Sequence, residues 1–141
     1  MAQPENRTRE EELYTLSYMQ QLYQSQHNAV VNEMNRVVQY LNELASLKKT
    51  LDDSGMLDGK DVLVSLGAGA YMNSRSDRLE SVLVDIGAGY VVEKDIGAAK
   101  AFVDDRTQRS TQTFNNLVKN RNELRDAIID VARRIDALNR R

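Results

Sequence analysis

The chain has 141 residues, enough for one domain, but only 6% of them are aromatic and none is Trp. This apolar inventory is small for a compact core and favours an elongated, mainly helical protein. The 19 basic and 21 acidic residues give a net charge of -2 without a basic stripe, which argues against nucleic-acid binding, and the lack of Cys excludes disulfides, thiolate metal sites and a Cys nucleophile.

The chain opens on the polar segment MAQPENRTREEE, which lacks the apolar run of a signal peptide. No later stretch approaches the roughly 18 consecutive apolar residues of a membrane span. We therefore expect a cytoplasmic protein with a flexible tail over residues 1–9.

A long helix is predicted over residues 10–54, because apolar residues recur there at alternating spacings of three and four, as in a coiled-coil seam. We expect Gly55 to cap its C-terminal end. With no Cys and no second His, His27 is interpreted as a solvated or hydrogen-bonded residue that fixes register, not as a metal ligand. The seam positions are Leu13, Leu16, Gln20, Tyr23, His27, Val30, Met34, Val37, Leu41, Leu44, Lys48 and Leu51.

The pattern changes over residues 60–94, where VLVSLGAG (62–69) recurs as VLVDIGAG (82–89) with six of eight positions identical. Alternating apolar residues in each copy predict four short strands in two related halves. Each Gly-Ala-Gly fits a hairpin turn, and it also fits a bend within a longer strand whose turn lies at residues 73–77. Both arrangements are compatible with the sequence.

Gly-Ala-Gly after a strand also suggests a nucleotide-binding loop, but neither copy has the third Gly, the following helix or the Lys that such loops use. We interpret the glycines as corners that permit positive φ. Four short strands cannot cover both faces or pair every edge, so either the helices or strands of other subunits must cover them. Other subunits are favoured, because the helices are expected to pack their apolar stripes against each other. We therefore predict obligate oligomerisation through Val62, Val64, Leu66, Gly67, Gly69, Val82, Val84, Ile86, Gly87 and Gly89.

A second long helix is predicted over residues 95–141, with Asp95 as its N-cap. If the β segment folds back, the helices lie antiparallel, with Leu51 near Ile96, and Leu13 near Ile135 or Leu138. The expected fold is mainly α, a long antiparallel two-helix coiled coil joined by two small hairpins. The second seam comprises Ile96, Lys100, Val103, Thr107, Ser110, Phe114, Leu117, Arg121, Leu124, Ile128, Val131, Ile135 and Leu138.

The order helix, DVLVSLGAGAYMNS, LESVLVDIGAGYVVEKDIGAAKAF, helix resembles the alpha-class subunits of the prefoldin family, and the doubled Gly-Ala-Gly is closest to the archaeal type. The resemblance implies a hexamer of two alpha and four beta-type subunits whose hairpins join into β-barrel-like platforms. It also implies an ATP-independent chaperone, a holdase, whose coiled-coil tips bind non-native client proteins and deliver them to a group II chaperonin. No cofactor is implied.

In an antiparallel pair the free tip comprises about residues 8–25 and 125–141. Tyr14, Tyr18 and Leu22 follow an i, i+4, i+8 spacing that places them in a stripe facing away from the partner helix. This stripe can bind clients, or it can pack on another coiled coil. The expected client-binding residues are Leu13, Tyr14, Leu16, Tyr18, Met19, Leu22, Val131, Ile135 and Leu138.

A second functional hypothesis is a structural coiled-coil adaptor that scaffolds partners and binds no clients. An enzyme is not expected, because one His, no Cys and an extended shape provide neither catalytic groups nor a pocket that excludes water. No catalytic, cofactor-binding or metal-binding residues are predicted.

Overall fold

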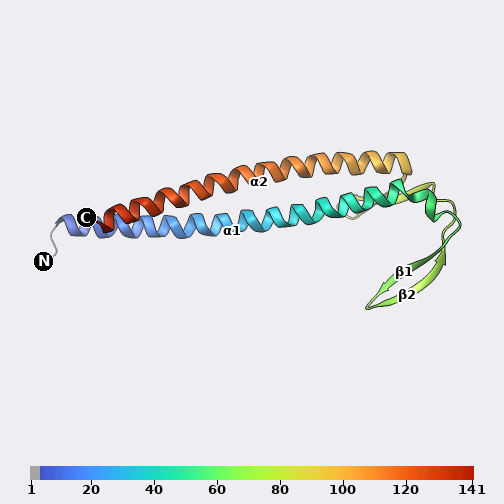
Figure 1. Ribbon diagram of the computed structural model, residues 1–141, viewed down its shortest axis with the longest axis horizontal. Coiled ribbons are helices and arrows are strands. Elements are labelled where there is room, and N and C mark those ends of the chain that lie inside the picture. The colour runs from blue at the N-terminus through green and yellow to red at the C-terminus, as the bar shows by residue number, and fades with distance from the viewer. Residues whose placement is uncertain (1–3) are drawn as a thin grey trace. The chain divides into compact units, whose positions relative to one another are not determined.

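The computed structural model describes residues 4–141. In chain order it contains the helix α1 (Pro4–Asp52), a short 3-10 helix η1 (Ser54–Leu57), the strands β1 (Asp61–Gly67), β2 (Ala70–Arg75), β3 (Ser81–Gly87) and β4 (Tyr90–Asp95), and the helix α2 (Ile96–Asn139) (Figure 1). The chain divides into two units. We call Met1–Gln39 with Gln112–Arg141 the tip unit, and Tyr40–Thr111 the hairpin unit.

The helix α1 is longer at its start than the sequence pattern predicted. It begins at Pro4, so residues 4–9 of the expected flexible tail are helical, while residues 1–3 lie outside the described part of the chain. Proline suits the first helical turn, because its ring presets φ and the N–H that it lacks would have no partner there. The seam pattern begins only at Leu13 and therefore could not indicate these residues.

The ends of the helices at the β segment differ in their capping. Asp95 is the N-cap of α2, as predicted, because its Oδ1 accepts a hydrogen bond of 2.7 Å from the amide of Ala98. Gly55 is not the C-cap of α1. It lies inside η1 and is not among the glycines with positive φ, a conformation that Gly59 adopts instead. The 3-10 turn continues the chain's right-handed winding, so the left-handed residue comes later.

The four strands form two separate antiparallel hairpins, β1–β2 and β3–β4. Their registers match: Val62 pairs with Ser74, and Val82 pairs with Lys94. In both hairpins the Gly-Ala-Gly segment forms the turn, which decides between the two arrangements that the sequence allowed. No closed barrel forms within residues 4–141.

Both predicted seams are confirmed by burial, since all their apolar residues are buried or half-buried. In the hairpin unit Leu51 packs in one cluster with Val103 and Ile96. In the tip unit Leu13 packs in one cluster with Ile135 and Leu138. The helices are therefore antiparallel within each unit, as predicted (Figure 1).

The seam residue His27 keeps part of its side chain in contact with water, in line with the prediction of a solvated or hydrogen-bonded residue. Its side chain is half-buried, and its Nδ1 is buried without a hydrogen-bond partner among the described residues.

Candidate functional site

The tip unit contains a small core between the two helices. Leu16, Val131 and Leu138 are buried there, and four further side chains pack against them. Each helix presents its seam to the other, so these groups are removed from water in the closed tip. Six of the nine predicted client-binding residues therefore belong to this core: Leu13, Leu16, Met19, Val131, Ile135 and Leu138.

The other three predicted residues form an exposed apolar stripe on α1. Tyr14 is 77% exposed, Tyr18 is 61% exposed and Leu22 is 42% exposed. Their spacing of four places them on one side of the helix, turned away from the seam. We call Tyr14, Tyr18 and Leu22 the tip stripe. It is accessible without any opening of the helix pair.

The sequence interpretation missed Ile129, which is also exposed in the tip unit. It follows the seam residue Ile128 directly and therefore points away from α1. The criterion that found the tip stripe, an apolar residue outside the seam, would have found Ile129 had it been applied to α2.

The hairpins expose apolar side chains on both faces. Val64, Leu66 and Ile86 of the predicted assembly residues are exposed, while Val62, Val82 and Val84 are half-buried. Leu63 and Leu83, at 67% and 74% exposure, were not predicted. The unbroken Val-Leu-Val runs could have indicated them, because a strand that is apolar at consecutive positions is typically covered on both faces. Further exposed apolar residues in the hairpins are Tyr71, Met72, Tyr90, Val91 and Val92.

Both turns depend on backbone that glycine permits. Gly69 and Gly89 each have φ of 79°, and Gly67 and Gly87 have φ of 93° and 112°. The strand register shifts just before each turn, between Ser65 and Gly67 in the first hairpin. These glycines are therefore conformational residues of the corners, as predicted, and none is followed by a helix that could bind a phosphate.

Of the two covers that the sequence allowed for the strands, other subunits were favoured, but one face of β3 is covered by the helices of this chain. Val82 and Val84 pack against Leu44, Leu51 and their neighbours in the core of the hairpin unit. The apolar stripe of α1 extends through Tyr40, Leu44, Leu47 and Leu51, and it is wide enough to contact both α2 and β3.

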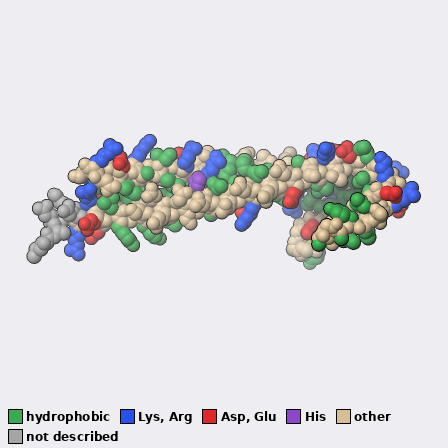
Figure 2. Space-filling view, turned by 60° about the horizontal axis from the view of Figure 1, so that its bottom comes forward, with side chains coloured by type: hydrophobic (Ala, Val, Ile, Leu, Met, Phe, Trp, Pro, Cys, Tyr) green, Lys and Arg blue, Asp and Glu red, His purple; other side chains and the backbone are tan. Residues whose placement is uncertain are grey.

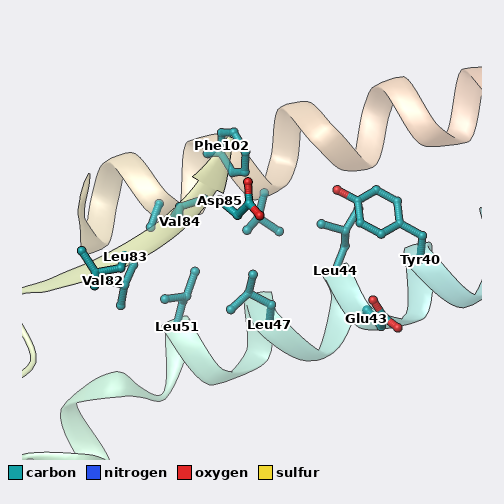
Figure 3. Close-up of a pocket in the computed structure, with 12 residues that line it drawn as sticks. Tyr40, Glu43, Leu44, Leu47, Leu51, Val82, Leu83, Val84, Asp85 and Phe102 are labelled. Carbon is teal, nitrogen blue, oxygen red and sulfur yellow. The ribbon is translucent and has the colours of Figure 1, made fainter. Parts of the chain in front are cut away.

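An open pocket of about 270 Å³ remains between β3 and the two helices. Figure 3 shows Leu47 and Leu51 of α1 on one side of it, with Val82 to Asp85 of β3 on the other. Arg106 holds this hairpin against α2, since its Nη2 donates to the carbonyl of Ile86 at 3.3 Å and its guanidinium lies 4.9 Å from the ring centre of Phe102.

Two ion pairs join the helices in the hairpin unit. The Nζ of Lys48 lies 2.7 Å from Asp104 Oδ1, and the Nζ of Lys100 lies 3.2 Å from Asp52 Oδ1. The hydrogen bond from Lys48 to Asp104, with the negative charge of that carboxylate, raises the pKa of Lys48. The two lysines that interrupt the seams are thus each paired with an aspartate on the other helix.

Charge elsewhere is dispersed. On the face shown in Figure 2, Lys and Arg are interspersed with Asp and Glu. Among residues 4–141, no group of three or more His, Asp or Glu side chains could hold a metal ion. Within the same residues, no helix is both long and apolar enough to cross a membrane.

The fold and its exposed groups define a coiled-coil subunit with two hairpins that expose apolar side chains. The family model described as Prefoldin subunit matches residues 23–141. The chain belongs to the prefoldin family and is of the alpha type, and family membership supports the role of a chaperone subunit.

Individual relatives agree with this assignment. The chain is 29% identical over 100 residues to a prefoldin subunit alpha from Thermococcus onnurineus, a match that covers 70% of this chain and 68% of the relative. It is 31% identical over 101 residues to a probable prefoldin subunit 5 from Dictyostelium discoideum, covering 69% and 63%. A cryo-EM structure of filamentous PFD from Methanocaldococcus jannaschii has the same fold, with a TM-score of 0.58, 24% identity, and coverage of 84% of this chain and 93% of that one.

Proposed function

We propose that the chain is the alpha subunit of a prefoldin hexamer with two alpha and four beta-type subunits, which acts in the cytoplasm as an ATP-independent holdase. In this proposal the hairpins join the subunits, the tips bind non-native proteins, and the complex delivers them to a group II chaperonin. The observation that carries the client-binding step is the tip stripe, whose three apolar side chains are exposed while the seam beside them is closed.

The chemistry of the stripe suits a client that is not fixed in shape. The tyrosines offer large apolar faces with a hydroxyl that tolerates water, and Leu22 adds aliphatic area at the end of the row. Such a patch recognises exposed apolar side chains without requiring a particular sequence. Several tips acting on one client would combine weak contacts through multivalency.

The assembly step is supported by the exposed strands of the hairpin unit. Apolar side chains such as Leu63 and Leu83 lie in water in the free chain, and each two-stranded sheet leaves its outer edges unpaired. Two-stranded hairpins are marginal alone, so strands from other subunits would stabilise them.

The proposal is tested in the assembled complex with the triple variant Tyr14→Gln, Tyr18→Gln, Leu22→Gln. The measurement is suppression of aggregation of chemically unfolded luciferase as complex is titrated in. Each apolar side chain contributes up to about 1.5–3 kcal/mol when fully buried, so we expect at least a ten-fold increase in the amount of complex needed.

The matched control is Ser17→Gln, Ser25→Gln, which changes two exposed polar residues of the same helix segment. The control should protect luciferase as well as the unaltered complex. Full protection by the triple variant, with the complex still assembled, would instead support the adaptor hypothesis, in which the chain scaffolds partners without binding clients.

A further inference from the structure

The two hairpin corners share an unusual backbone. Ala68 and Ala88 both have φ of 52°, and the glycine after each has φ of 79°. Positive φ at both central residues of a two-residue loop is typical of a type I′ turn, whose first position favours Asn, Asp or Gly. Alanine is disfavoured there, because its Cβ crowds the following carbonyl oxygen. Each hairpin thus has an unfavourable residue at the first position of its turn.

Beside the corners, the amides of Gly67 and Gly87 donate hydrogen bonds to Ser65 Oγ and Asp85 Oδ1, but these bonds do not involve the two alanines. Both are exposed. A Cβ added to the neighbouring Gly69 or Gly89 would meet no heavy atom within 4 Å among the described residues, so the corners are surrounded by open space. An Asn at either corner would fit the backbone better and would be hydrated. A small apolar side chain is the better choice only where water is removed from the corner.

The residues around the corners indicate what removes the water. Residues 62–74 include no charged side chain, although most of them are exposed. The matching residues 82–94 include Asp85, Glu93 and Lys94, but residues 86–92, which form the second corner, have no charge. Leu66 and Tyr71 flank the first corner, and Ile86 and Tyr90 flank the second, all exposed. Burying corners with such neighbours is favourable only against a surface that is itself apolar and uncharged.

We propose that the methyl groups of Ala68 and Ala88 are contact points of the assembly, each seated against an apolar, uncharged surface of a neighbouring prefoldin subunit. This inference rests on the proposed function, since it requires that the hairpins join the subunits. Both corners have the sequence Gly-Ala-Gly and the same φ values at the alanine and the glycine after it, so the two methyl groups are presented in the same way. The alanines make the hairpins less stable in the free chain, and they contribute apolar contact in the complex.

The test uses full-length Ala68→Asn, Ala88→Asn and full-length Ala68→Gly, Ala88→Gly. In the free chain at high dilution, the Asn variant should increase hydrogen-exchange protection of the strand amides by about five-fold, because the left-handed conformation is better tolerated. We then dilute the complex with a beta-type prefoldin subunit and follow its dissociation by sedimentation velocity. The complex of the Asn variant should dissociate at a protein concentration about ten-fold higher than the unaltered complex, because the Asn amide is buried without a partner. The Gly variant removes the methyl groups and also relieves the unfavourable positive φ without adding a polar group, and it should weaken the complex by a few-fold.

The control Ala137→Asn places the same amide at an exposed position of α2 in the tip unit and should leave the complex unchanged. Greater protection of the free hairpins with unchanged assembly would overturn this inference, since the corners would then be exposed in the complex. The proposed function is tested separately by Leu63→Ser, Leu83→Ser on the strands. If those substitutions also leave the complex intact, assembly through the hairpins is itself refuted.

Discussion

Lys48 donates a hydrogen bond of 2.7 Å to Asp104 across the helix pair, and four residues later in α1 and four residues earlier in α2 the direction reverses, with the Nζ of Lys100 lying 3.2 Å from Asp52 Oδ1. The four side chains form an alternating charge pattern, which we call the chequerboard. Each lysine pairs with an aspartate on the other helix and lies four residues from an aspartate on its own helix. A slip of the helices would bring like charges together. The two lysines in the seams therefore act on register more than on stability, since all four groups are partly solvated.

Reversing one charge should expose this role. In Lys48→Asp three carboxylates meet a single lysine, so the melting temperature of the coiled coil should fall by a few degrees at low salt. The quadruple variant Lys48→Asp, Asp52→Lys, Lys100→Asp, Asp104→Lys restores the chequerboard and should recover most of the loss. The measurement is circular dichroism at 10 mM and 1 M NaCl. A penalty that is equal at both salt concentrations would contradict an electrostatic origin, because exposed charges are screened at 1 M.

The pKa of Lys48 sets the pH range over which its pair stabilises the fold. The pKa is raised in the folded chain, chiefly by the hydrogen bond to Asp104, so its contribution is complete below the ordinary pKa of lysine and is lost as the pH rises through the raised value. The difference in melting temperature between the protein and Lys48→Met should be constant from pH 7 to 9 and should shrink only under strongly alkaline conditions. A difference that disappears between pH 7 and 9 would show that another group titrates.

Val103 should be a sensitive core position of the hairpin unit. It is 1% exposed and packs with Leu44, Leu51 and Ala99, where α1, α2 and β3 meet. Val103→Ala removes two methyl groups and leaves a cavity, so the free energy of unfolding should fall by about 1–3 kcal/mol. Urea denaturation measures the loss. The control Ala101→Gly also shortens a side chain in the first turns of α2, but at an exposed position, and it should lower stability only by the helix propensity difference of about 1 kcal/mol.

The helices could be predicted from the sequence because a seam is a local, periodic signal, and every apolar seam residue is indeed covered. The start of α1 at Pro4 and the turn after Asp52 could not be predicted, because the seam pattern extends only from Leu13 to Leu51. The packing of Val82 on Leu44 depends on how the chain folds back, and no local pattern records this.

The candidate site also has a part that the sequence could predict and a part that it could not. Spacing alone placed Tyr14, Tyr18 and Leu22 outside the seam, and their exposure agrees with that prediction. Met19 also lies outside the predicted seam, yet it packs against the tip core. Its long unbranched side chain can bend back to the seam, which a count of residues per turn does not reveal.

Gly89 should be required for the second hairpin through its backbone alone. Its φ is 79°, and a Cβ there would meet no heavy atom within 4 Å, so a substitution acts through conformation and not through a clash. Gly89→Val should destabilise β3–β4 by about 1–2 kcal/mol or more and speed hydrogen exchange of its strand amides while β1–β2 is unaffected. Gly55→Val is the matched control, because Gly55 has equal space around it and no positive φ. Equal effects of both substitutions would contradict the role assigned to the turn.

Substitutions in the tip core should lower stability, whereas substitutions in the tip stripe should leave stability almost unchanged. Leu16 is buried against Val131 and Leu138, so Leu16→Ala should lower the stability of the tip by about 2–4 kcal/mol and accelerate hydrogen exchange at residues 8–25 and 125–141. Tyr14→Gln alters an exposed side chain and should change stability by less than about 0.5 kcal/mol.

Client binding by these two variants then distinguishes two mechanisms of the proposed holdase. If the tip stripe alone binds clients, Tyr14→Gln weakens protection of unfolded luciferase, while Leu16→Ala, whose stripe is intact, protects normally. If the helices must separate so that seam residues also contact the client, Leu16→Ala eases opening and protects at a lower concentration of complex, because less free energy is spent on exposing the core. Loss of protection in Leu16→Ala with no loss in Tyr14→Gln would contradict both mechanisms and would indicate that an ordered tip is itself the binding surface.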